Sequence, residues 1–292
     1  MLMTRTFIRG LTTVIAILAL SASSVLASTV IDLTNPGSNN FAGNNQANLG
    51  GSFIVQQTSD QPPAGEVVDT FVRLQTNHLS SQGYNTDAAT PQFDEVPADT
   101  HSLSLSDVPK VNLTVNGVTE PYRQFLLNID QVFKSVPLSL NQVQIFLRDT
   151  GDATGAVPLA QATLFTPPVI TFLDPFSIEV FRLNVDSPDF LQINLKDANT
   201  SGGGVGDMFL YVRDAVFQDA VISNPNNTFV YLYSQFGFPP IGYPNLGGSQ
   251  DWSVLKSSPV AVPEPSTVVL AISGLGVLAA TRLRRPKVQA RA

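Results

Sequence analysis

Apolar and polar residues alternate in short runs along the middle of the chain, and Pro, Gly, Asn and Asp separate the runs. The runs are rich in β-branched and aromatic residues, and no long stretch repeats with the 3.6-residue period of a helix. This pattern predicts an all-β fold, an antiparallel β-sandwich that is jelly-roll-like. The expected strands are Ser52–Gln57, Val67–Gln75, Val111–Val115, Tyr122–Val132, Val143–Arg148, Gln161–Phe165, Ser177–Val185, Phe190–Leu195, Met208–Val212, Thr228–Phe236 and Ser253–Leu255.

Two of these runs indicate how the strands are buried. In Tyr122–Val132, the side chains of Phe125, Leu127 and Ile129 fall on one side, which predicts a strand with one face in the core. In Thr228–Phe236 both sides are apolar, which is typical of a central strand that is covered on both faces.

The dipeptide Asn116–Gly117 is a strong turn signal between Val115 and Val118. Two-residue hairpin turns need positive φ angles, and Asn and Gly adopt these angles most readily. The sequence therefore predicts a tight β-hairpin at this point.

Residues 1–27 have the features of a secretory signal peptide with a signal helix. Arg5 and Arg9 give a positive start, the apolar run Leu11–Leu20 follows, and Ala27 ends a region of small or aliphatic residues. Signal peptidase is therefore expected to cleave after Ala27. The alternative interpretation is an uncleaved membrane anchor.

The C-terminal region predicts a single transmembrane helix at residues 267–283. The 17 residues of Pro265–Thr281 carry no charge, and as a helix they would span ~26 Å, close to the ~30 Å of a bilayer's hydrocarbon layer. Residues 259–266 form a linker before it, and the basic tail 284–292 is expected in the cytoplasm. A short helix packed on a soluble core is the alternative. The basic cluster that stops the helix is Arg282, Arg284, Arg285 and Lys287.

The positive charges at the two ends of the chain are both expected to stay in the cytoplasm, so the middle of the chain is expected outside it. The whole chain has a net charge of −7, and the segment Ser28–Val262 holds 9 Lys and Arg against 22 Asp and Glu. An acidic body argues against nucleic-acid binding. The sequence has no Cys, which excludes disulfides, Cys-ligated zinc and a Cys nucleophile. The exported body is expected to span residues 28–258.

The C-terminal segment resembles the PEP-CTERM sorting signal. The residues that carry the resemblance are the box Pro263, Glu264 and Pro265, the apolar stretch after it, and the pair Arg284–Arg285. The resemblance implies that an exosortase-type enzyme cuts near the box, after the C-terminal helix has held the chain transiently in the inner membrane. It also implies a bacterial protein delivered to the cell surface or to an extracellular polysaccharide. The two prolines keep the box extended and outside the following helix.

The body of the chain is also similar to an uncharacterised group of domains that precede PEP-CTERM tails. In that group an acidic pair precedes a tryptophan, whereas this chain has Gln250–Asp251 before Trp252. The resemblance implies a fold and a location but no activity. The segments that carry it are Asp69–Gln75, Gly83–Asp87, Tyr122–Asp130, Leu138–Phe146, Gly206–Phe209, Phe229–Gly237 and Asp251–Trp252.

One segment has the spacing of a calcium loop. Asp197, Asn199 and Ser201 place oxygens at alternate positions, and a glycine follows at the sixth position. Met208 stands at the twelfth position, where a bidentate acid is expected, and Asp207 lies one residue short of it. Calcium is the one cofactor that the sequence suggests, and a turn between strands is the alternative.

No catalytic motif is present, so we expect no enzymatic activity. The sequence lacks G-x-S-x-G, H-E-x-x-H and a phosphate-binding G-K-[ST] loop. His78 and His101 are lone histidines in polar segments, where surface positions are the simplest interpretation. A late group of aromatic residues either stacks on sugars or packs in the core. Its members are Tyr231, Tyr233, Phe236, Phe238, Tyr243 and Trp252.

These features together predict an exported β-sandwich with a structural or adhesive role in an extracellular polysaccharide or biofilm. A carbohydrate-binding module is the first alternative. A secreted hydrolase is the second, and it would need two facing carboxylates in a cleft.

Overall fold

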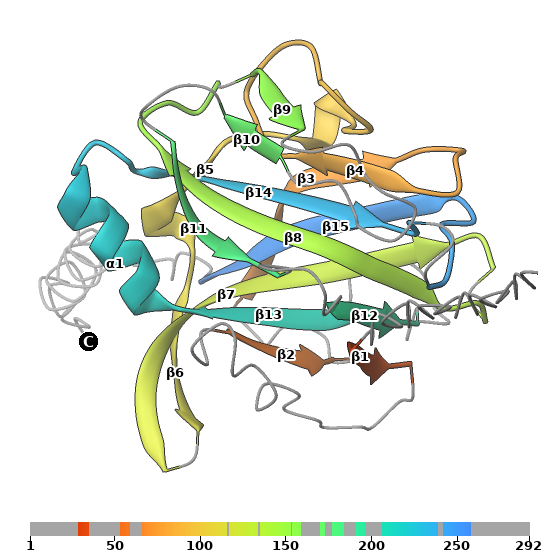
Figure 1. Cartoon of the computed structure of the whole chain (residues 1–292), viewed down its shortest axis with the longest axis horizontal. Coiled ribbons are helices and arrows are strands. Elements are labelled where there is room, and N and C mark those ends of the chain that lie inside the picture. The colour runs from red at the N-terminus through yellow and green to blue at the C-terminus, as the bar shows by residue number, and fades with distance from the viewer. Residues whose placement is uncertain are drawn as a thin grey trace, which may run out of the picture.

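The strands pair into two sheets that pack face to face as a β-sandwich, as predicted (Figure 1). The computed structural model describes residues 29–34, 53–58, 66–115, 117–133, 135–152, 154–158, 170–172, 177–183, 191–196, 206–238 and 242–257.

The first sheet has seven strands, of which five form a continuous path. All pairings are antiparallel except that of β1 with β12, which is parallel. In order across the sheet, the strands are β1 (Thr29–Leu33), β12 (Leu191–Leu195), β8 (Leu138–Arg148), β14 (Phe229–Phe236) and β4 (Ser81–Tyr84), with β11 (Ile178–Arg182) on β8 and β5 (Leu103–Ser104) on β14.

The second sheet has six strands and is antiparallel throughout. Each strand on its path is the sequence neighbour of the strand at the same place in the first sheet, so the chain repeatedly crosses from one sheet to the other. In order, its strands are β2 (Phe53–Gln57), β13 (Met208–Arg213), β7 (Val118–Gln131), β15 (Gly248–Ser257) and β3 (Glu66–Gln75), with β6 (Lys110–Val115) on β7.

The smaller elements lie around the two sheets. A two-stranded ribbon of β9 (Ala156–Pro158) and β10 (Ile170–Phe172) lies beside the first sheet. Two 3₁₀ turns, η1 (Pro97–Asp99) and η2 (Leu105–Asp107), lie between β4 and β6 in the sequence. The helix α1 (Asp214–Ser223) follows β13 directly at one end of the sandwich (Figure 1).

The core between the sheets is formed by alternate residues of the strands. Phe125, Leu127 and Ile129 of β7 all belong to it, which confirms the predicted buried face of that strand. Trp252 of β15 is fully buried in the same core, and its ring N–H donates to the hydroxyl of Ser234. Because the chain has no Cys, this apolar interior is the main source of stability.

Strand β14 is covered on both faces, as its sequence predicts. Val230 and Leu232 point into the core between the sheets, whereas Tyr231 and Tyr233 belong to a second cluster on the outer face of the first sheet. There the ring of Phe172 from β10 meets Tyr231 edge to face, with 5.5 Å between the ring centroids. The β9–β10 ribbon therefore helps to cover the outer face of β14.

The structure confirms ten of the eleven predicted strands within the described residues. The eleventh, Gln161–Phe165, lies outside them, and so do the signal helix and the transmembrane helix. The predicted hairpin is confirmed, since Val115 pairs with Val118 and Gly117 has a φ of +81°. Within the described residues, no helix is long and apolar enough to span a membrane.

A buried ion pair fixes helix α1 against the second sheet. The Nε of Arg123 on β7 lies 2.6 Å from Oδ1 of Asp214, and both side chains are more than nine-tenths buried. The same guanidinium donates to the carbonyl oxygens of Leu105 and Val108, at 2.7 and 2.8 Å. Lys110 approaches the other carboxylate oxygen at 3.0 Å. The cluster thus connects β6, β7, η2 and the first residue of α1.

This cluster predicts a loss of stability in acid. Burial alone would raise the pKa of Asp214, but hydrogen bonds from Lys110 and Arg123 outweigh it and hold the pKa below the ordinary 3.8. A carboxylate with a lowered folded-state pKa contributes stability above pH 3.8, and that stability is lost as the pH falls through the folded-state value. Melting temperatures between pH 6 and pH 2 should fall more steeply for the wild type than for Asp214→Asn. Equal slopes would contradict this assignment.

Candidate functional site

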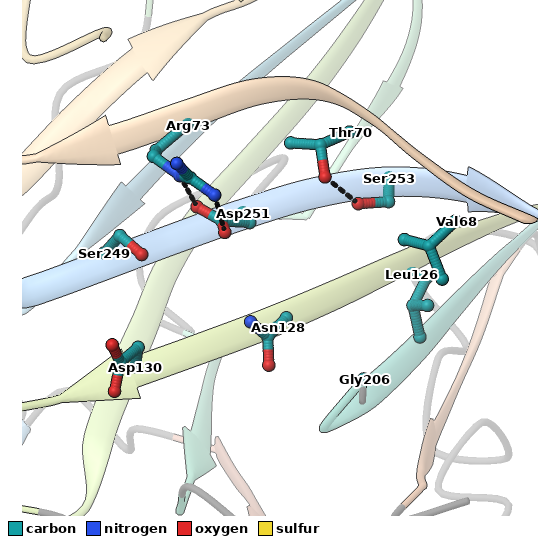
Figure 2. A pocket seen from close by; sticks show the side chains of 10 residues that line it. All are labelled: Val68, Thr70, Arg73, Leu126, Asn128, Asp130, Gly206, Ser249, Asp251 and Ser253. Atoms are coloured by element: carbon teal, nitrogen blue, oxygen red, sulfur yellow. Dashed lines mark hydrogen bonds and ion pairs between the residues drawn. The ribbon is translucent and has the colours of Figure 1, made fainter. Parts of the chain in front are cut away.

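The outer face of the second sheet carries a polar pocket of about 200 Å³, formed mainly by strands β3, β7 and β15 (Figure 2). A volume of this size suits a small ligand, such as one ring of a longer polymer, rather than a large cofactor. Its lining residues are Val68, Thr70, Arg73, Leu126, Asn128, Asp130, Gly206, Ser249, Asp251 and Ser253.

A β-bulge in β3 brings two polar residues to this face. Trp252 pairs with Val72, and the next residue, Ser253, pairs with Thr70, so Phe71 is an extra residue in β3. Without the bulge, Thr70 and Arg73 would point to opposite faces, because they are three residues apart. With it, both lie in the pocket, while Phe71 and Val72 are buried in the core.

The start of β15 approaches β7 so closely that only glycine fits there. Gly248 has a φ of +90°, and a Cβ at this position would lie 1.5 Å from the carbonyl oxygen of Asp130. The close approach sets the register in which Ser249 pairs with Asp130 and Asp251 pairs with Asn128. These four residues consequently form two neighbouring rows across the pocket.

Arg73 and Asp251 form a two-bonded ion pair at the centre of the site (Figure 2). Nε and Nη2 of Arg73 each donate to one oxygen of Asp251 at 2.9 Å, and Nη1 donates to Asp99 at 2.7 Å. The hydrogen bond with Asp251 raises the pKa of Arg73 above its ordinary value, so the guanidinium stays charged. The side chain of Asp251 is 9% exposed and that of Arg73 is 34% exposed. Both groups are held in fixed positions.

Five other polar side chains line the pocket, and three of them retain open hydrogen-bonding capacity. The other two, Thr70 and Ser253, bond to each other at 3.0 Å. In contrast, no group in the described part of the chain bonds to the side chains of Asn128, Asp130 or Ser249. These three offer an amide, a carboxylate and a hydroxyl on one side of the ion pair (Figure 2). Such a set can both donate to and accept from a ligand rich in hydroxyl groups.

Of the predicted calcium ligands, Asp197, Asn199 and Ser201 lie outside the described residues. Asp207 is described and buried, and its Oδ2 accepts the backbone N–H of Ile129 at 2.7 Å. Its backbone N–H donates to the carbonyl of Leu127, and its carbonyl accepts from the N–H of Thr58. Asp207 therefore ties β13 to β2 and β7. In the part of the chain that the structure describes, no group of three or more His, Asp or Glu residues is arranged to hold a metal ion.

The two histidines lie away from the pocket. Nδ1 of His101 donates to the carbonyl oxygen of Ser102 at 2.7 Å, and its Nε2 lies 3.9 Å from Asp69. His78 is exposed in the turn between β3 and β4. Neither residue lines the polar pocket.

Most of the late aromatic group packs inside the protein. Tyr231, Tyr233, Phe236 and Trp252 are each fully buried, so they have no face available for stacking on a sugar. Tyr243 is 42% exposed, in the segment between β14 and β15. The core interpretation of this group is confirmed for the four buried rings.

Glu95 is a buried acid with a structural role. Burial raises the pKa of Glu95 above its ordinary value. Its two carboxylate oxygens accept the backbone N–H groups of Tyr84 and Phe93, at 2.9 and 2.7 Å. These bonds fold the segment after β4 back onto the sheet, next to Gly83, where a Cβ would lie 2.8 Å from the Glu95 side chain.

Comparison with known families identifies the C-terminal segment. Residues 261–285 match the PEP-CTERM protein-sorting motif, which confirms the resemblance seen at Pro263–Glu264–Pro265. The motif marks the chain as a surface protein that is exported to the cell envelope and processed by an exosortase-type enzyme. No curated protein and no solved structure matches the chain. The function of the sandwich must therefore be argued from its own residues.

The pocket residues were not identified as a site from the sequence. Ser249, Asp251 and Ser253 do occupy alternate positions along β15, which places polar side chains on one face of the strand. That signal shows which side chains point outward but not what they meet. Arg73 lies 178 positions from Asp251, and only the sheet order brings them together.

Proposed function

We propose that this exported sandwich binds extracellular polysaccharide at the polar pocket on its second sheet and so has an adhesive, non-enzymatic role in the matrix. In this scheme signal peptidase removes residues 1–27 during export. The apolar stretch 267–283 then holds the chain in the inner membrane until the sorting enzyme acts. The sorting motif supports the surface location, and the pocket supports the binding role.

The observation that carries the proposal is the open polar set of Asn128, Asp130 and Ser249 beside the fixed Arg73–Asp251 pair. Sugars are recognised by rigidly held amide, carboxylate and hydroxyl groups that match their hydroxyls in pairs. The two flanking strands hold these groups in one register, so little conformational entropy is lost on binding.

The composition of the pocket suits weak binding that repeats along a polymer. Among the described residues that line it there is no aromatic ring on which a sugar could stack. Hydrogen bonds alone give modest affinity because each one replaces a bond to water. Many copies on one surface would still hold a polysaccharide firmly, since linked sites raise the effective concentration.

Removing the open polar set is expected to abolish binding. The triple variant Asn128→Ala, Asp130→Ala and Ser249→Ala should lose about a hundredfold in affinity, because three bonds to the ligand are lost and each is worth about 1 kcal/mol. The full chain, purified in a detergent without a sugar headgroup, would be assayed on a glycan array and by calorimetry with the best glycan.

The matched control changes three exposed polar residues elsewhere: Asn112→Ala, Thr114→Ala and Asp219→Ala, on β6 and α1. This variant should bind like the wild type. Retained binding in the pocket variant, or no glycan bound by the wild type, would contradict the proposal and favour a purely structural role.

A further inference from the structure

The charges around the pocket define which sugars it can take. Arg73 is the one cation that lines it among the described residues, and it lies beside two carboxylates, Asp251 at 2.9 Å and Asp99 at 2.7 Å. Its positive charge is therefore already compensated within the protein. An acidic ligand would have to compete with both carboxylates for this guanidinium.

The free carboxylate of the pocket is that of Asp130. It is exposed, and within the described chain no cation pairs with it. Beside it lie the Ser249 hydroxyl, in the same row, and the Asn128 amide, in the neighbouring row, and both groups are neutral. Lys256, farther along β15, forms ion pairs with Asp69 and Asp107. The potential at the open part of the pocket is consequently negative.

From this arrangement we infer that the pocket selects sugars without acidic groups and binds a sugar with a free amino group most tightly. The inference rests on the proposed function and names its ligand class. An ammonium group donates a charge-assisted hydrogen bond to Asp130, while neighbouring hydroxyls bond to Asn128 and Ser249. A uronate or sulfate would place a second negative charge beside Asp130.

The test compares oligosaccharides of glucosamine, neutral hexoses and uronates as probes on one array and by calorimetry. The wild-type full chain should rank amino sugars above neutral sugars, with no uronate bound. Asp130→Asn should lose about tenfold in affinity for the amino sugars and clearly less for the neutral ones, because the amide oxygen still accepts from a hydroxyl but no longer attracts an ammonium group. Added salt should reduce the ratio of the affinity for amino sugars to that for neutral sugars, because it screens the charge of Asp130.

The control is Asp219→Asn on helix α1, which makes the same change in net charge away from the pocket. It should bind like the wild type, because Asp219 lies away from the pocket. If the amino sugars were held only by general attraction to an acidic protein, Asp219→Asn and Asp130→Asn would lose the same affinity. Uronates ranking first, or an equal loss in both variants, would overturn this inference while leaving glycan binding intact. An array with no bound glycan would instead overturn the proposed function itself.

Discussion

Replacing Arg123 with alanine is expected to remove a large part of the stability of the sandwich. The substitution leaves Asp214 buried with only the half-exposed Lys110 as its cation, and it removes the guanidinium that donates to the carbonyls of Leu105 and Val108. Removing one partner of a buried pair costs about 3–5 kcal/mol. Domains are typically stable by about 5–15 kcal/mol, so the effect should be visible as a large drop in the denaturation midpoint.

The matched control is Arg182→Ala on β11, since Arg182 also pairs with an acid, Glu179, but both side chains are partly exposed. Exposed pairs contribute at most about 1 kcal/mol. Urea unfolding followed by tryptophan fluorescence compares the two, because Trp252 is the single tryptophan and lies in the core. If Arg123→Ala shifted the midpoint no more than Arg182→Ala, the anchoring role of the buried pair would be wrong.

A further variant separates lost packing from uncompensated charge. Arg123→Met combined with Asp214→Leu replaces both charges by apolar groups of similar size. It should recover part of the stability that the single change loses, because no buried carboxylate remains. The recovery would be incomplete, since the hydrogen bonds from the guanidinium to the carbonyls of Leu105 and Val108 are still missing.

The strands could be predicted from the sequence because their signal is local. A two-residue alternation such as Phe125, Leu127 and Ile129 follows from the geometry of one strand and needs no partner. Helix α1 was missed because it has only ten residues. Its buried apolar residues, Phe217 and Ala220, give too little periodicity to identify a helix of under three turns.

The pocket could not be predicted because it depends on pairing between distant segments. The bulge at Phe71 exists only relative to β15, and the apolar sequence around it reads as an ordinary strand. Arg73 and Asp251 were visible as charged residues, but their distances to each other and to Asn128 follow from the order β7–β15–β3. The sorting motif, in contrast, lies in consecutive residues near the C-terminus, so it could be recognised from the sequence alone.

The sorting motif leads to the second large prediction. β15 ends at Ser257, and the matched motif begins at residue 261, so the box at Pro263–Pro265 follows the sandwich closely. Six extended residues reach at most ~22 Å, which places the box within that distance of the end of β15. The sorting enzyme must therefore work next to the folded domain.

Changing the box should block processing and leave the chain in the inner membrane. In the triple variant Pro263→Ala, Glu264→Ala and Pro265→Ala, the apolar stretch 267–283 stays attached, and nearly all of the protein should fractionate with the inner membrane. The wild type should instead yield a C-terminal peptide that ends near the box, as read by mass spectrometry. Ser258→Ala, outside the matched residues, is the control and should be processed normally. A full-length wild-type chain in the soluble interior of the cell would contradict the whole scheme, because both charged ends would then have failed to direct export.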